Sequence, residues 1–436
     1  MINWKSGAVG TLMAALGSTG AVAESSPDPN KQASIQLALV TTSLRPVARP
    51  VPETGQEVVQ VVASNEPFAL WLSAFRDRAQ EEGISSATLD QAFADVIIDP
   101  EVVRLDRNQS EFSKTIWEYL DSAVSDLRVR NGRAALAQHH AALSQIEARY
   151  GVEKEVVTAI WGLESSFGAF RGGNNTIRSL ATLAHDTRRA EFFEAELLAA
   201  LQILEAGDVS ARGMKGSWAG AMGHTQFMPS SYHLYAVDFT GDGKRDIWSD
   251  DPRDALASTA AYLAGFGWTT GQPWGVEVRL PEGFDYVLAR RELTRSPSDW
   301  AAAGVLDTSG KPVPDHGDAS ILLPAGAEGA AFMIFDNFTV LEKYNTADAY
   351  VIGVGHLADR LGGGLVIAAD WPRGDRALTF SERKELQRRL TGAGFDTQKI
   401  DGRVGPLTIN AVRSYQTANG LVPDGYASPR LLERLR

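Results

Sequence analysis

Apolar residues recur at three- and four-residue spacing along much of the chain, which is the pattern of amphipathic helices. Before residue 150 the pattern predicts four helices, in the segments PFALWLSAFRDRAQEEG, SSATLDQAFADV, EFSKTIWEYLDSAVSDLRVRNG and RAALAQHHAALSQIEARYG. Ser85 or Ser86 is the expected cap of the second helix, and each helix is expected to end near a Gly or a turn residue. His139 and His140 are neighbours on the fourth helix, so they point about 100° apart and do not form a metal clip.

The next predicted helix, residues 155–168 (EVVTAIWGLESSFG), has a carboxylate within its apolar stripe. Val156 and Ile160 lie on one face, and Glu164 falls one turn beyond Ile160. Desolvation favours the protonated form of a Glu and raises its pKa, as a general acid near neutral pH requires. A structural Glu paired with an Arg is the alternative.

A loop, RGGNNTIRS, and a long helix, HDTRRAEFFEAELLAALQILEAG, are predicted to follow. Asp186 or Thr187 is the expected N-cap of this helix. Arg188 and Arg189 then fall in its first turn, where the helix dipole disfavours cations. Their place suggests an anionic partner, and a solvated helix end is the alternative.

Residues 216–232 (GSWAGAMGHTQFMPSSY) are rich in Gly and Ala, which lets the backbone pass close to a neighbour. Gln226 is a lone amide among apolar residues. An amide that donates and accepts at once suits a neutral hydrogen-bonding substrate such as an acetamido sugar. The alternative is a tight packing loop, with Pro229 starting the next helix.

Residues 238–254 (DFTGDGKRDIWSDDPRD) match the first part of an EF-hand calcium loop. The matching positions are Asp238, Thr240, Asp242, Gly243 and Asp246. Ser249 stands where the closing Glu is expected, so Asp250, Asp251 or Asp254 would have to supply the last carboxylate. An acidic turn without a metal is the alternative.

The chain between the acidic loop and residue 378 divides into four parts. A helix with Tyr262 follows the acidic loop, and short alternating segments between residues 274 and 340 predict a small antiparallel sheet. TVLEKYNTADAYVIGVGHLADRLGGG predicts a helix that contains Tyr344, Asn345 and Tyr350, whose aromatic and amide groups can pack on sugar rings or belong to the core. Residues 361–378 read as a linker.

The last segment, 379–436, contains a half-repeat in which a helix leads to a tight turn. Gln387 corresponds to Gln416, and Asp401 corresponds to Asp424. Two such halves predict a small three-helix domain without a catalytic constellation.

Composition narrows the function classes. The chain has a net charge of -12 and no basic cluster interleaved with aromatics, so nucleic acid is not expected as a partner. It has no cysteine, which excludes disulfides, thiolate chemistry and a lipidated Cys. Residues 1–23 have the pattern of a secretory signal, and residues 24–64 read as a disordered leader. No later segment predicts a transmembrane span, so we expect a soluble, exported protein.

The motifs GLESSFG, DTRRAEFF, GSWAGAMGHTQFMPSSYHLYAVDFTGDG and EKYNTADAY, in this order, resemble the lytic murein transglycosylase B family. The resemblance covers residues 65–360, and the tail resembles a peptidoglycan-binding domain. It implies an α+β, mainly α, fold: a lysozyme-like catalytic core with helical and small antiparallel β subdomains, plus a C-terminal three-helix domain.

The implied activity is cleavage of the β-1,4 bond between N-acetylmuramic acid and N-acetylglucosamine, which leaves a 1,6-anhydromuramyl end. Glu164 would be the single acid/base, in contrast to glycosidases with two carboxylates. The family's groove residues correspond to Arg188, Arg189, Ser217, Gln226, Tyr262, Tyr344, Asn345 and Tyr350. Phe192 departs from the family's Tyr and is left out.

The resemblance also implies a structural calcium ion held by Asp238, Thr240, Asp242 and Asp254, with no cofactor needed for the chemistry. Peptidoglycan strands are the expected partner, and a periplasmic monomer is the expected form. Two other functions remain open at this point. One is a catalytically silent wall-binding scaffold, and the other is a muramidase that uses water.

Overall fold

The computed structural model describes residues 66–107, 114–186 and 189–436 of the chain. These residues belong to one compact unit, Ser64–Arg436. The predicted signal segment 1–23, the leader 24–64 and Arg188 lie outside the described residues.

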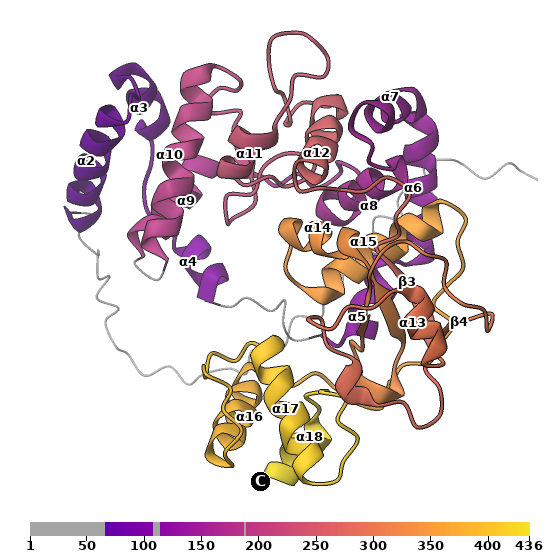
Figure 1. Ribbon diagram of the computed structural model, residues 1–436. Coiled ribbons are helices and arrows are strands. Elements are labelled where there is room, and N and C mark those ends of the chain that lie inside the picture. The colour runs from indigo at the N-terminus through magenta and orange to yellow at the C-terminus, as the bar shows by residue number, and fades with distance from the viewer. Residues whose placement is uncertain (1–65, 108–113, 187–188) are drawn as a thin grey trace, which may run out of the picture. The chain divides into compact units, whose positions relative to one another are not determined.

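The described residues between 66 and 265 are mainly helical (Figure 1). The helices are α2 (Glu66–Glu81), α3 (Ser86–Phe93), α4 (Pro100–Arg107), α5 (Ile116–Ala123), α6 (Asp126–Gln138), α7 (His140–Tyr150), α8 (Lys154–Ser165), α9 (Thr176–His185), α10 (Ala190–Ala206), α11 (Pro229–Tyr235) and α12 (Arg253–Gly265). Their apolar faces pack into one large hydrophobic core around α8. Two short strands, β1 (Asn174–Asn175) and β2 (Lys215–Gly216), pair within this region.

Several helix boundaries differ from the sequence prediction. Ser85 is the cap of α3, since its side chain accepts from the Thr88 N–H. The predicted break at Gly132 is wrong, because Gly132 lies inside α6, where a Cβ would come within 2.6 Å of the Leu361 side chain. The chain breaks at Ser125 instead, whose side chain caps α6.

The segment before Arg189 also folds differently from the prediction. Residues 176–185 were expected partly as loop, but they form α9, capped by the Asn175 side chain. Asp186 therefore ends α9 and does not start the next helix. Helix α10 begins at Ala190, with Arg189 as its N-cap residue.

The predicted antiparallel sheet is present. Its strands are β3 (Gly275–Arg279), β4 (Leu306–Asp307), β5 (Ser320–Leu322) and β6 (Ala331–Ile334), in the order β4-β3-β6-β5. In this register Val276 lies opposite Met333. Three short helices accompany the sheet: η2 (Tyr286–Leu288), α13 (Pro297–Ala302) and η3 (Gly326–Glu328). This β subdomain has a hydrophobic core of its own, with Trp300 and Met333 fully buried.

The single helix predicted over residues 339–364 is two helices, α14 (Asp336–Tyr344) and α15 (Asp348–Leu361). Asn345 has extended backbone and ends α14. Two glycines let α15 pack closely on both sides, since a Cβ on Gly353 would lie 2.9 Å from the Tyr119 ring and one on Gly355 would lie 2.4 Å from Trp274.

The C-terminal helices α16 (Phe380–Gly392), α17 (Pro406–Ala418) and α18 (Pro429–Leu435) enclose a third hydrophobic core. The half-repeat is visible in the hydrogen bonds. Gln387 Oε1 accepts from the Gly402 N–H at 2.8 Å, and Gln416 Oε1 accepts from the Gly425 N–H at 2.9 Å. Asp424 also accepts from the Ala327 N–H, so the second turn contacts the β subdomain.

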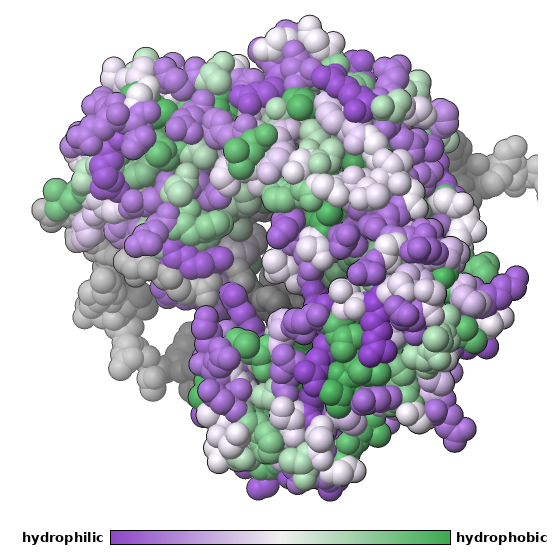
Figure 2. All heavy atoms as spheres, in the orientation of Figure 1, coloured by the Kyte–Doolittle hydropathy of each residue, from purple (hydrophilic) through white to green (hydrophobic). Residues whose placement is uncertain are grey.

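Within the described ranges, every helix is too short or too polar to cross a bilayer. Figure 2 shows that hydrophilic residues are spread over all parts of the visible face, with hydrophobic residues in interspersed groups.

Candidate active site

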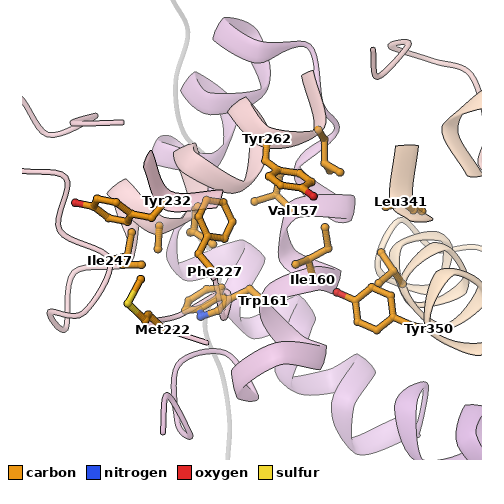
Figure 3. Packing of buried hydrophobic residues seen from close by; sticks show 14 of the residues in the cluster. Val157, Ile160, Trp161, Met222, Phe227, Tyr232, Ile247, Tyr262, Leu341 and Tyr350 are labelled. Atoms are coloured by element: carbon orange, nitrogen blue, oxygen red, sulfur yellow. The ribbon is translucent and has the colours of Figure 1, made fainter. Parts of the chain in front are cut away.

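Helix α8 brings Glu164 to the edge of the core. Val157 and Ile160 are fully buried and Trp161 is 3% exposed, whereas Glu164, one turn after Ile160, is half-buried. Figure 3 shows Ile160 between α8 and the Tyr350 ring, whose hydroxyl points toward α8. The sequence predicted that the apolar face of this helix ends at a carboxylate, and Glu164 is indeed half-buried there.

The chain turns sharply directly after Glu164. Ser166 and Phe167 both have positive φ, at 50° and 60°, a region that residues with side chains rarely adopt. The Phe167 ring folds back over Gly162, where a Cβ would lie 2.6 Å from it. Ser165 Oγ donates to the His224 carbonyl oxygen at 2.5 Å. The helix thus ends one residue after Glu164, and this turn holds the carboxylate at the helix end.

Tyr350 is a hydrogen-bond partner of Glu164. Its hydroxyl donates to Glu164 Oε1 at 2.5 Å, and its side chain comes from the first turn of α15. Tyr350 is 6% exposed. Burial, and secondly the Glu164 carboxylate, hold the pKa of Tyr350 well above its ordinary value. The hydroxyl therefore remains protonated and acts as a donor.

Tyr344 lies next to Tyr350, and their rings stack with centroids 6.5 Å apart and an angle of 7° between the planes. The Tyr344 hydroxyl donates to the Thr225 carbonyl oxygen at 2.6 Å. Asn345 is exposed, and its Oδ1 accepts from the Ala347 N–H at 3.0 Å, so it stabilises the turn between α14 and α15.

Tyr262 is only 7% exposed, and its hydroxyl donates to the Lys343 carbonyl oxygen at 2.5 Å. Its ring packs against Tyr344 at a centroid distance of 5.0 Å. Burial raises the pKa of Tyr262 to about 12. Tyr262 therefore supports the Tyr344 ring from within the core, and its direct contact with a ligand stays a prediction.

The Gly-rich segment places Gln226 beside the chain that follows Glu164. Gln226 has a positive φ of 55°, and its Nε2 donates to the Arg171 carbonyl oxygen at 3.0 Å and to the Gly223 carbonyl oxygen at 2.8 Å. The expectation that this amide both donates to and accepts from a substrate needs correction. Backbone carbonyls use both amide hydrogens, which leaves Oε1 as the atom for a ligand.

Ser217 lies on the same segment and is half-buried. Its Oγ accepts from the Ala221 N–H at 3.1 Å. Gly172, with φ of 88°, passes so close that a Cβ would lie 2.6 Å from the Ser217 nitrogen. Three segments that are distant in sequence therefore meet: residues 164–172, 216–227 and 344–350.

Arg189 has a protein partner in this structure. Its Nη2 lies 2.7 Å from Oδ1 of Asp106, a carboxylate that is 2% exposed. The guanidinium also lies 4.7 Å from the centre of the Phe193 ring. The buried Asp106 of α4 therefore accounts for the position of Arg189 at the start of a helix. A contact between Arg189 and a substrate anion stays a prediction.

The acidic loop brings Asp238, Asp242 and Asp254 together, with carboxylate oxygens within 4.8 Å of one another. Asp254 is 2% exposed, and burial raises its pKa, while three backbone N–H groups, from Phe239, Thr240 and Asp246, donate to it. Among the described residues, no Lys or Arg forms an ion pair with this trio.

The trio fits a hard divalent cation. Its oxygens are the ligands that calcium prefers, and a divalent cation would offset most of the negative charge of three neighbouring carboxylates. Thr240 Oγ1 lies 3.4 Å from Asp238 Oδ1, at the edge of the cluster. Of the three acids that the sequence left open, Asp254 is the one that lies with Asp238 and Asp242, whereas Asp251 pairs with Arg253.

Sequence reasoning missed Arg171 and His224. Trp161 Nε1 donates to His224 Nδ1 at 3.1 Å, and Arg171 donates to the Ser249 carbonyl oxygen at 2.5 Å and to Asp250 at 2.7 Å. Burial lowers the pKa of His224, so the ring is neutral. Arg171 therefore contacts two parts of the site. Its side chain binds the acidic loop, and its own backbone carbonyl accepts from Gln226 Nε2. A cation directly before two glycines was the available signal for Arg171.

A cavity of about 440 Å³ opens beside these residues. Its walls include Asn131, Gln138, His139, Trp161, Arg171, His224 and Asp250. His139 was expected on a helix, but it lies at the junction of α6 and α7, with its ring 5.3 Å from that of Trp161.

A half-buried glutamate at the end of a core helix, in a mainly helical fold with small antiparallel sheets, is typical of the lysozyme-like class. A family model described as the transglycosylase SLT domain matches residues 67–359, and a putative peptidoglycan binding domain matches residues 381–435. The chain belongs to the transglycosylase SLT family.

Solved structures agree with this assignment. SltB3 from Pseudomonas aeruginosa, in complex with NAG-anhNAM-pentapeptide, is 51% identical with a TM-score of 0.82, over 85% of this chain and 99% of that one. SLT35 from Escherichia coli, in complex with calcium, is 31% identical with a TM-score of 0.58, over 68% and 93%.

Among curated proteins, the membrane-bound lytic murein transglycosylase B of Escherichia coli (strain K12) is 36% identical over 246 residues. This match covers 55% of the present chain and 65% of that relative, slightly less than two thirds of its length.

Proposed function

We propose that this protein is a lytic transglycosylase that cleaves the β-1,4 bond between N-acetylmuramic acid and N-acetylglucosamine in peptidoglycan. The observation that supports this most directly is the Glu164 carboxyl group, held at the end of α8 by the hydroxyl of Tyr350. Family membership supports the same substrate class.

In the proposed reaction Glu164 acts twice. Its protonated carboxyl group first gives its proton to the glycosidic oxygen as the bond from C1 to that oxygen breaks. The carboxylate then accepts the proton of the muramyl 6-hydroxyl as O6 bonds to C1. The products are a free 4-hydroxyl on one fragment and a 1,6-anhydromuramyl end on the other. No water is consumed.

The other residues have positioning roles in this proposal. Oε1 of Gln226 is the amide atom left to accept from a sugar N–H or O–H. Tyr344 and Tyr350 form a stacked pair beside the carboxylate. Ser217, Asn345, Tyr262 and the two arginines Arg188 and Arg189 complete the proposed groove set.

The test is Glu164→Gln, assayed on purified sacculi with mass analysis of the released muropeptides. Activity should fall by about 10²- to 10⁴-fold, because general acid and base assistance is lost. The control is Glu155→Gln on the same helix, where Glu155 is half-buried and pairs with Lys154. Undiminished release by Glu164→Gln would reject the mechanism.

Product mass separates the other two functions. Reducing ends, heavier by one water, would identify a hydrolytic muramidase. Binding to sacculi without release of fragments would identify a silent scaffold.

The C-terminal domain is proposed to bind the wall. Phe380 is 55% exposed, and Ile400, Val404 and Leu407 beside the first turn of the half-repeat are 39–45% exposed. Exposed aromatic and aliphatic side chains suit the ring faces and methyl groups of amino sugars and stem peptides. The second turn instead contacts the β subdomain through Asp424.

The proposed location is the periplasm, reached by the signal segment 1–23. A structural calcium ion in the acidic loop is part of the proposal, with ligands from Asp238, Thr240, Asp242 and Asp254. It would hold the loop together and supplies no group for the cleavage step.

A further inference from the structure

The turn between α14 and α15 determines where two of the active-site tyrosines lie. Tyr344 is the last residue of α14, and Tyr350 is in the first turn of α15. Asn345 between them has extended backbone, with φ of -153° and ψ of 124°. No continuous helix therefore fixes the position of one tyrosine relative to the other.

One arginine from outside this segment bridges the turn. Arg291, in the β subdomain three residues after the end of η2, donates from Nη1 to Glu342 of α14 and from Nη2 to Asp348 of α15. Its guanidinium also lies 5.0 Å from the centre of the Phe338 ring. The two planar N–H groups of a single side chain thus join the end of one helix to the start of the next.

Arg291 supplies the positive charge between two acids at this turn, in addition to the hydrogen bond from the Ala347 N–H to Asn345. The side chains of Glu342 and Asp348 are only 21% and 35% exposed, so each carboxylate is partly desolvated. Without Arg291 they would face each other as like charges in a region with little water, which destabilises any arrangement that keeps them together. The turn would open at the position that carries Tyr344 and Tyr350.

The rest of α15 has separate anchors. Trp274 packs on Gly355, and its Nε1 donates to Asp359 Oδ2 at 3.0 Å. Loss of Arg291 should therefore disturb the first turn of α15 and leave its later turns in place.

We propose that Arg291 is a positioning residue for catalysis: it clamps Glu342 to Asp348 so that the Tyr350 hydroxyl meets Glu164. This inference rests on the proposed transglycosylase function. Arg291 has no described contact with Glu164 and acts only through the turn. Because a displacement of about 1 Å at a reacting group costs up to about 10²-fold in rate, a loosened turn should lower kcat.

The experiment compares Arg291→Met with Arg291→Lys in the full chain, on soluble glycan strands. Arg291→Met should lower kcat by about 10- to 100-fold with little change in KM. Arg291→Lys should recover part of the loss, because an ammonium neutralises the carboxylates but lacks the fork that reaches both. Arg76→Met is the control, because Arg76 is also partly buried, paired with an Asp and near a Phe ring, but lies on α2.

A double-mutant cycle tests whether Arg291 acts through Tyr350. In a Tyr350→Phe background, Arg291→Met should lower kcat further by no more than about twofold, since the hydrogen bond it supports is already absent. A full 10- to 100-fold loss in that background, or an equal loss in Arg76→Met, would overturn the proposal.

A readout independent of turnover separates this inference from the proposed function. Hydrogen exchange of peptides covering residues 342–352 should be faster in Arg291→Met than in the parent chain, and unchanged in Arg76→Met. If the parent chain releases no fragments, the proposed function fails while this measurement still tests the clamp. Unchanged exchange would reject the clamp itself.

Discussion

The hydroxyl of Tyr350 donates a 2.5 Å hydrogen bond to Oε1 of Glu164, although the two residues are 186 positions apart in the chain. The donor comes from α15 and the acceptor from the last turn of α8. Because Tyr350 keeps its proton, its hydroxyl donates to Oε1 of Glu164 and so fixes the orientation of the carboxylate.

Tyr350→Phe should lower kcat by about 10- to 100-fold, because a hydrogen bond to a charged group contributes about 1.5 to 3 kcal/mol. KM should change little, since the ring and its stacking on Tyr344 are kept. Tyr232→Phe is the control. It removes another buried tyrosine hydroxyl, but that hydroxyl donates to the backbone carbonyl of Arg245 and not to Glu164. Equal losses in both variants would show that the effect is one of stability.

Calcium should stabilise the folded protein through the acidic loop. At a concentration about 100-fold above Kd, binding adds about 2.7 kcal/mol to the free energy of unfolding. The Tm should therefore be higher in calcium than in EGTA, and Asp254→Asn should abolish the difference. Asp251→Asn, outside the trio, should keep it. A calcium-dependent Tm that survives in Asp254→Asn would place the ion elsewhere.

His356 should make the fold sensitive to acid. It is 8% exposed, and burial lowers its pKa from 6.5 to about 4. Above pH 6.5 both the folded and the unfolded chain hold it neutral. Between pH 6.5 and about 4 only the unfolded chain binds the proton, so stability falls as the pH falls, by about 3 kcal/mol over the whole interval.

The measurement for His356 is the free energy of urea unfolding between pH 7.5 and 4.5. His356→Gln should flatten this dependence, whereas His140→Gln, at an exposed position, should leave it unchanged. An identical slope in His356→Gln and the parent chain would contradict the prediction.

Phe380→Ala should weaken the binding of sacculi in a pull-down assay, because it removes the exposed aromatic side chain of the proposed wall-binding face. Val422→Ala is the control, since Val422 is 51% exposed but belongs to the second half of the repeat. Equal binding by all three proteins would exclude this face.

Removal of residues 379–436 should weaken binding to sacculi and retain activity on short soluble glycans. The tail has its own hydrophobic core, and the active-site segments lie outside it. The deletion also removes the ion pair between Arg430 and Glu328, so the Tm of the truncated chain is the control. Undiminished sacculus binding would contradict a role of this domain as the anchor.

Local patterns predicted much of the fold. The apolar stripe of α8 leads to Glu164, the alternating segments of residues 274–340 form the sheet, and the half-repeat forms three helices. These predictions succeed because burial of one face imposes a period on the sequence of each element.

Other boundaries depended on neighbours. Gly132 lies inside α6, and its lack of a Cβ leaves room for the Leu361 side chain, so this glycine serves packing and does not end the helix. The break at Asn345 was hidden because both flanking segments have helical periodicity, and the bridge across it comes from Arg291 in another subdomain.

The sequence by itself determined which residue types are available: one carboxylate in an apolar stripe, an amide in a Gly-rich loop, acids at EF-hand spacing and paired tyrosines. The tertiary structure decided how they are used. It brought the Tyr350 hydroxyl to Glu164, and it paired Arg189 with Asp106. It also directed both amide hydrogens of Gln226 to backbone carbonyl oxygens. Hydrogen bonds and ion pairs require contact within a few ångströms, and periodicity within one element says nothing about which distant segment provides the partner.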